Sequence, residues 1–140
     1  MATEQFPIRI GARSRLLLRV LFGVRPDRAS LELGDAPDGD VLVRFGWATF
    51  RTPLANVAAW RLEGPWLWIT AIGIRMSLRH HDVSFDGSPH GGVRLDFHRT
   101  VRWLVIDVPA IYVSADDLDA VAAALTARGI AGVDARKPRA

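Results

Sequence analysis

An alternation of apolar and polar residues constrains this chain most, because it starts at Ala29 and continues for about eighty residues. Leu31 and Leu33 alternate with polar residues, and the same pattern returns at Val41 and Val43 after a turn-forming segment, 35–40. Successive side chains of a strand point to opposite faces, so each such segment buries one face of a sheet. The pattern predicts a mainly β, antiparallel protein of about seven strands.

Further strands are expected at 48–53, 57–63, 83–86, 93–97 and 103–108. The first of these ends near Pro53, because proline cannot donate to a ladder. Turn residues in 87–92 predict a hairpin between the strands on either side, and the apolar segment Trp103–Val108 is expected deep in the sheet. The course of the run Trp66–Ile74 stays open, since Gly64-Pro65 breaks the chain before it and Gly73 weakens any strand there.

One helix is expected after the strands. Ser114 is the expected N-cap, and Gly129 is the expected end. Between them lies one apolar stripe, formed by Leu118, Val121, Ala122 and Leu125. A helix with a single apolar face must cover something, and an open end or edge of the sheet is the available partner.

The length of 140 residues is that of a single folding unit. We expect one domain over residues 6–130, with a flexible N-terminus at 1–5 and a flexible basic tail at 131–140. Within the domain, Ala12–Val24 fits both helical and strand spacing, and we favour a short helix.

Composition excludes several classes of protein. The chain has no cysteine, so disulfides, zinc–cysteine sites and cysteine nucleophiles are excluded. Its arginines are spread along the chain and mixed with acids, so no nucleic-acid partner is expected. The first residues lack a basic region followed by an apolar stretch, and the longest apolar runs are about half the ~20 residues of a spanning helix. We therefore expect a soluble, cytoplasmic protein.

Strands followed by one helix resemble the pleckstrin-homology-like (PH-like) barrel, and Arg51–Val57 resembles the turn midway along its bacterial members. The resemblance implies a single antiparallel split barrel, two roughly orthogonal sheets closed at one corner by the C-terminal helix. Four segments are similar to a family of small uncharacterised actinobacterial proteins, which implies no activity: Phe22–Pro26, Thr52–Val57, Ala71–Ser77 and Gly91–Leu95.

PH-like members that bind phosphoinositides use a basic loop between their first two strands. Here that loop, Gly34–Asp40, holds three carboxylates and no basic residue. Carboxylates repel a polyphosphate, so no phosphoinositide binding is expected.

The histidines His80, His81 and His90, together with Asp82, are the types of residue that ligate a divalent metal. However, adjacent His80 and His81 point to opposite faces of an extended chain, and no His-x-x-x-His pair exists. We favour solvent-exposed histidines, so no metal and no cofactor is assigned. His98 is also expected on the exterior.

Two of the five tryptophans, Trp66 and Trp68, share a face after Gly64-Pro65. Core packing is the favoured interpretation, and an exposed aromatic ledge that binds a partner is the alternative. The candidate binding residues are Trp66, Trp68, Arg75, Arg79, His80 and His81.

Arginines also flank the apolar residues of Ala12–Val24, as in a helix that lies on an anionic membrane. Arg13, Arg15 and Arg19 are the candidate anionic contacts. A terminal helix packed on the barrel, with its arginines in water, fits the same pattern and is favoured.

The sequence contains no nucleophile elbow and no phosphate-binding glycine loop, so no catalytic residue is assigned. We expect a non-catalytic binding or scaffolding domain that engages a protein partner or a second copy of itself. A metal-binding protein or metal-assisted enzyme using His80, His81, Asp82 and His90, and membrane attachment through Ala12–Val24, are the alternatives.

Overall fold

The computed structural model describes residues 4–10, 29–35, 38–64, 73–76, 83–86 and 91–136. This part of the chain is mainly β, with two sheets and one helix, as the sequence predicted. The strands pair within two separate sheets, and no closed barrel forms among the described residues. Predictions made for other residues, including Ala12–Val24, lie outside this part.

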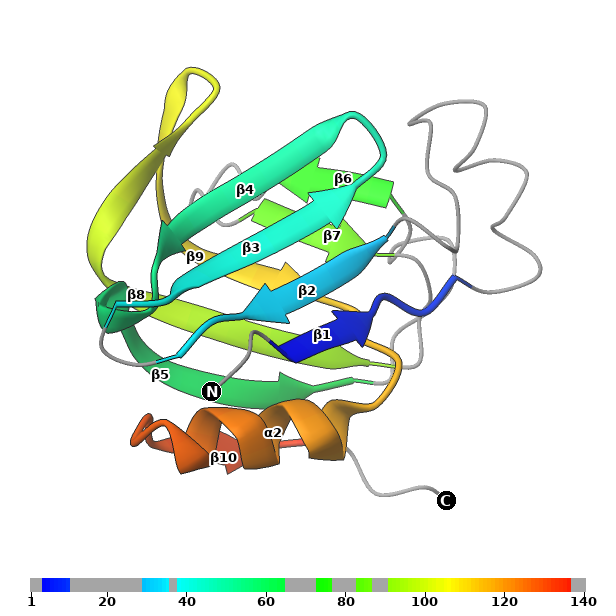
Figure 1. Cartoon of the computed structure of the whole chain (residues 1–140). Coiled ribbons are helices and arrows are strands. Elements are labelled where there is room, and N and C mark those ends of the chain that lie inside the picture. The colour runs from blue at the N-terminus through cyan, green and yellow to red at the C-terminus, as the bar shows by residue number, and fades with distance from the viewer. Residues whose placement is uncertain are drawn as a thin grey trace.

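The first sheet is an antiparallel meander in the order β1-β2-β3-β4 (Figure 1). Its strands are β1 (Glu4–Pro7), β2 (Ser30–Leu33), β3 (Asp40–Phe45) and β4 (Ala48–Pro53). The predicted hairpin around 35–40 is confirmed, since Leu33 pairs with Val41. A short 3-10 helix, η2 (Leu54–Asn56), then leads into the second sheet.

The second sheet has the order β10-β5-β8-β9-β7-β6. Its strands are β5 (Val57–Glu63), β6 (Gly73–Met76), β7 (Val83–Asp86), β8 (Gly92–Trp103), β9 (Ile106–Val113) and β10 (Gly132–Asp134). The two sheets meet at one corner, where Ile8 bridges Ala115 and Asp116 N–H donates to Pro7 O at 2.7 Å.

The predicted hairpin between 83–86 and 93–97 is wrong. β7 pairs antiparallel with β6 and parallel with β9. β8 is 12 residues long and pairs with β5 on one side and β9 on the other, so both of its edges are occupied. Turn residues in 87–92 marked a change of direction, but they did not determine the partner strand.

The prediction of one deep strand over Trp103–Val108 is also wrong. The chain reverses at Leu104 and Val105, which form the turn between β8 and β9. In β9 burial becomes continuous only from Ala110 to Val113, whereas in its first half Val108 alone is buried.

Both ends of the described chain contain strands where the sequence predicted none. Glu4 and Gln5 belong to β1, and β10 pairs in parallel with β5 at Trp60–Leu62. The indole ring of Trp60 packs on Gly132, where any side chain would collide with it, and Trp60 Nε1 donates to Ile130 O at 2.9 Å. This contact holds β10 beside β5, and the alternation pattern gave no sign of it.

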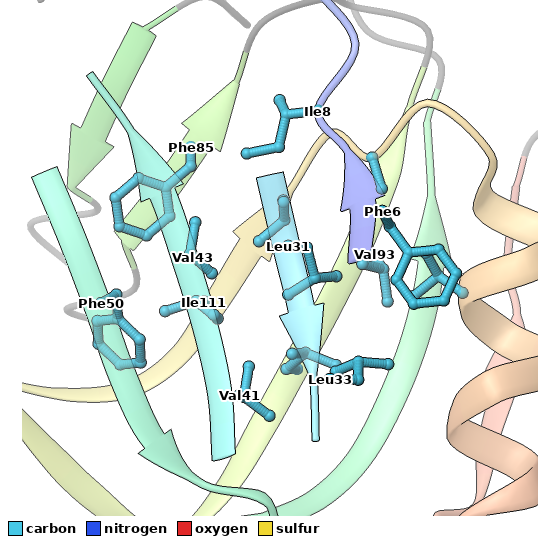
Figure 2. Close-up of a cluster of buried hydrophobic side chains, with 14 of the residues drawn as sticks. Phe6, Ile8, Leu31, Leu33, Val41, Val43, Phe50, Phe85, Val93 and Ile111 are labelled. Carbon is cyan, nitrogen blue, oxygen red and sulfur yellow. The ribbon is translucent and has the colours of Figure 1, made fainter. Parts of the chain in front are cut away.

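The apolar faces of the two sheets pack against each other and form the core (Figure 2). Val41 and Val43 of β3, Phe50 of β4, and Val93 and Ile111 of the second sheet are fully buried. The strand alternation read from the sequence predicted this inward face.

The helix α2 (Leu118–Ala127) begins three residues later than expected. Asp117 is its N-cap and accepts a hydrogen bond from Ala120 N–H at 3.0 Å. Ser114 is not the cap, because it still belongs to the extended chain after β9 and its hydroxyl donates to Phe85 O at 3.4 Å. Gly129, with φ 78°, ends the helix as predicted, and Ile130 N–H closes it on Leu125 O.

The apolar face of α2 is buried at Leu118, Val121 and Leu125, as predicted, and it packs against β5 and β8. Ala122 of the predicted stripe is only half-buried, and Ala124 is buried instead. Figure 1 shows α2 beside β5, at the side of the molecule where β1 ends the first sheet. Arg128 connects the helix to that sheet. Its guanidinium donates to Gly34 O at 2.8 Å and to Glu4 Oε1 at 3.0 Å.

Candidate functional site

The outer half of the β8–β9 hairpin extends from the two sheets (Figure 1, yellow). The pairing of β8 with β9 is interrupted between Asp96 and Val101. Pro109 lies opposite this interruption, and because proline has no N–H to donate, the ladder cannot continue through it. The extra residues of β8 form a bulge whose side chains at His98, Arg99 and Thr100 are exposed.

The side chain of Asn56 satisfies the backbone of the bulge. Asn56 Nδ2 donates to Arg99 O at 3.0 Å and to Thr52 Oγ1 at 3.1 Å, and Asn56 Oδ1 accepts from Arg99 N–H at 3.0 Å. Asn56 is buried in η2, so the bulge is fixed to the connection between the two sheets.

The turn at the end of the hairpin carries apolar side chains in solvent. Leu104 is 63% exposed and Val105 is 81% exposed. Leu104 has a φ of 54°, and it is the one non-glycine residue with positive φ in the part of the chain that the structure describes. A leucine in this conformation costs about 1 kcal/mol or more, whereas glycine adopts it freely.

Two tryptophans extend this apolar surface to the first sheet. Trp47 follows Gly46 in the β3–β4 turn and is 60% exposed. Its ring stacks on that of Trp103, with centroids 6.4 Å apart and an interplanar angle of 11°. We call Trp47, Trp103, Leu104 and Val105 the tip patch.

Trp103 anchors the tip patch to the body of the protein. Its Nε1 donates to Thr49 O at 3.1 Å, and its ring meets Phe85 edge-on with centroids 5.8 Å apart. Phe85 is fully buried, and its ring also packs against that of Phe50, with centroids 6.4 Å apart. A continuous aromatic contact therefore runs from the core to the tip patch, which fixes the geometry of the patch.

A pocket of about 550 Å³ lies on the outer face of the first sheet, with Leu42 in its lining. Two arginines line the pocket. Arg44 Nε lies 3.2 Å from Glu32 Oε2, and Arg51 Nη1 lies 3.9 Å from Asp40 Oδ2. Four carboxylates line it, from Glu32, Asp35, Asp38 and Asp40. Carboxylates outnumber guanidinium groups, so a phosphate would meet repulsion there.

Most candidate residues from the sequence lie outside the described part of the chain: Trp66, Trp68, Arg79, His80, His81, Asp82, His90, Arg13, Arg15 and Arg19. Arg75 lies in β6 opposite Ser84, and nothing is described of its side chain. His98 is exposed, as predicted. Among the described residues, no three histidines or carboxylates are grouped so that they could hold a metal ion.

No binding role was predicted from the sequence for Trp47, Arg99, Leu104 or Val105. Gly46-Trp47 between two alternating strands is a recognisable two-residue turn, and it could have indicated an exposed tryptophan. Leu104 and Val105 carry no such sign, since neither is a turn-forming residue.

Comparison of the chain with protein-family models, curated proteins and solved structures found no match. In the part of the chain that the structure describes, no helix combines the length and apolar character needed to cross a membrane.

Proposed function

We propose that the protein is a non-catalytic binding domain that engages a protein partner through the tip patch. The observation that carries this proposal is the concentration of exposed apolar side chains. Within the described residues four large apolar side chains are exposed, and three of them, Trp47, Leu104 and Val105, belong to this patch. Aromatic and aliphatic groups gathered in this way are typical of interaction sites.

The conformation of Leu104 supports the same function. Glycine at position 104 would remove the backbone strain, and a polar residue at position 105 would replace the exposed valine. The chain instead places two aliphatic residues in water at a cost to the fold. A turn backbone held in one conformation loses little freedom on binding, which favours affinity for a partner of matching shape.

We further propose that the architecture is a PH-like split barrel. Support comes from the β1–β4 meander, the second sheet that packs on it, and α2 across the side where the two sheets diverge. Fold alone does not determine function, so the binding proposal depends on the tip patch and not on this likeness.

A random peptide library displayed on phage tests the proposal. The full chain is the bait, and a variant with Leu104→Gly and Val105→Ser removes the peptides that bind elsewhere. We expect enriched peptides that bind the wild-type chain and lose most of their affinity for this variant. Val133→Ser is the matched control, because Val133 is 58% exposed but lies in β10, outside the patch.

The absence of any peptide that depends on the tip patch would contradict the proposal. Self-association that disappears in the Leu104→Gly, Val105→Ser variant, measured by analytical ultracentrifugation, would replace the separate partner with a second copy of the chain.

A further inference from the structure

We infer that the partner presents a carboxylate to Arg99 together with apolar side chains for the tip patch. This inference rests on the proposed function and adds the chemical character of the partner. Every arginine whose side chain the structure describes, except Arg99, has a carboxylate within 4.0 Å.

Arg99 is the exception, and its position makes the exception informative. Its side chain is exposed at the bulge of β8, on the same strand that leads to the tip patch. No carboxylate of the described residues approaches its guanidinium within that distance. An exposed guanidinium with no internal partner can form a two-point contact with a carboxylate supplied by another molecule.

The backbone of Arg99 is already ordered, which makes such a contact less costly. The side chain of Asn56 forms hydrogen bonds with both the N–H and the C=O of Arg99, and Asn56 is itself buried. Binding at Arg99 therefore restricts only the side chain, and the backbone loses no further freedom.

The spacing along β8 limits the shape of the partner. Arg99 and Leu104 are five residues apart, and a strand rises ~3.3 Å per residue, so the two positions are separated by at most ~17 Å. An extended peptide of about six residues spans this distance. The partner segment should thus combine Asp, Glu or a terminal carboxylate with an apolar residue about five positions away.

An anionic membrane is a weaker explanation of the same features. Residues 98–107 contain two arginines, Arg99 and Arg102, and one aspartate, Asp107, so this segment carries a formal charge of 2 − 1 = +1 with His98 neutral. Each basic residue contributes only about 1 kcal/mol near an anionic surface. In addition, Trp103 Nε1 is occupied by Thr49 O, and a fluid bilayer gains nothing from a patch held in one geometry.

The test uses synthetic, fluorescently labelled copies of the peptides selected by the tip patch. Each is made with a free and with an amidated C-terminus, and with Asp and Glu replaced by Asn and Gln, so that the source of the carboxylate is identified. We expect affinity for the full chain to fall about tenfold with Arg99→Gln and to fall less with Arg99→Lys, because lysine keeps the positive charge but cannot form the two-point contact. Arg61→Gln is the control, because Arg61 is exposed but paired with Glu63.

Three results would overturn the inference in distinguishable ways. Peptides that bind the tip patch but show no acidic residue and no response to Arg99→Gln would refute it and leave the proposed function intact. The absence of any tip-dependent peptide would refute both. Binding to vesicles of phosphatidylcholine and phosphatidylglycerol that is lost with Leu104→Gly and Val105→Ser would replace the peptide with a membrane.

Discussion

At the scale of single residues, one buried amide holds the bulge that positions Arg99. Asn56 donates to the carbonyl of Arg99 and accepts from its N–H, in the stretch where Pro109 prevents strand pairing. A short polar side chain thus replaces the missing ladder. Alanine at this position cannot do so and leaves both backbone groups without their partner.

We therefore predict that Asn56→Ala lowers the free energy of unfolding by about 2 kcal/mol, because two partly buried backbone groups of Arg99 lose their hydrogen bonds. Denaturant titration measures the change. Thr52→Val is the control, since it removes one acceptor of Asn56 and keeps both bonds to Arg99. Equal losses in the two variants would contradict the assigned role of Asn56.

A second residue-scale prediction concerns pH. Hydrogen bonds from the Arg136 side chain and backbone lower the pKa of Asp134 from 3.8 to about 2. The lowered pKa belongs to the folded state, so the stabilising contribution is present above about pH 3.8 and is lost as the pH falls toward 2.

NMR titration of the Asp134 carboxyl group should give a midpoint near 2, and Arg136→Gln should move it back toward 3.8. A midpoint of 3.8 in the wild-type chain would show that the contact between the two side chains does not persist in solution.

At the scale of elements, α2 depends on specific residues at its two ends. Asp117 caps the first turn, and Gly129 closes the last turn in a left-handed conformation, with no atom near enough to hinder a side chain. We predict that Asp117→Ala and Gly129→Ala each cost about 1 kcal/mol of unfolding free energy, the first through the lost cap and the second through backbone strain alone. Thermal unfolding followed by circular dichroism measures both. An unchanged free energy of unfolding in Asp117→Ala would contradict the observed cap.

Arg128 joins α2 to the first sheet, and its side chain is only 3% exposed. Its guanidinium contacts Gly34 O, Leu33 O, Ala124 O and Glu4 Oε1. Arg128→Ala leaves several carbonyl groups unsatisfied, so we predict a loss of about 3 kcal/mol in the free energy of unfolding. Glu4→Gln removes only the exposed part of this contact, and denaturant titration should show a loss below about 1 kcal/mol for it.

The elements also show what the sequence could and could not predict. Strands β2 to β5 were predicted because alternation and turn residues are local signals. The partner of β7 was not, since strand pairing depends on distant segments that compete for the same edge. The tip patch was missed for a related reason: Leu104 and Val105 continue the apolar run after Trp103, and no glycine or asparagine marks the turn.

At the scale of the whole molecule, the two sheets share the core and both contribute to the tip patch. Trp47 comes from the first sheet and Trp103 from the second, and their stacking joins the two sheets beyond the core. Phe85 connects this pair to the buried aromatic residues. Trp103 therefore attaches the β8–β9 turn, which carries Leu104 and Val105, to the body of the protein.

As proposed binding residues, Leu104 and Val105 should contribute nothing to the stability of the fold. The free energy of unfolding of the Leu104→Gly, Val105→Ser variant decides this. We predict a value equal to that of the wild-type chain or higher by up to about 1 kcal/mol, because glycine relieves the backbone strain at position 104. A value lower than wild type by more than about 1 kcal/mol would show that the turn stabilises the hairpin by packing, and would contradict the account.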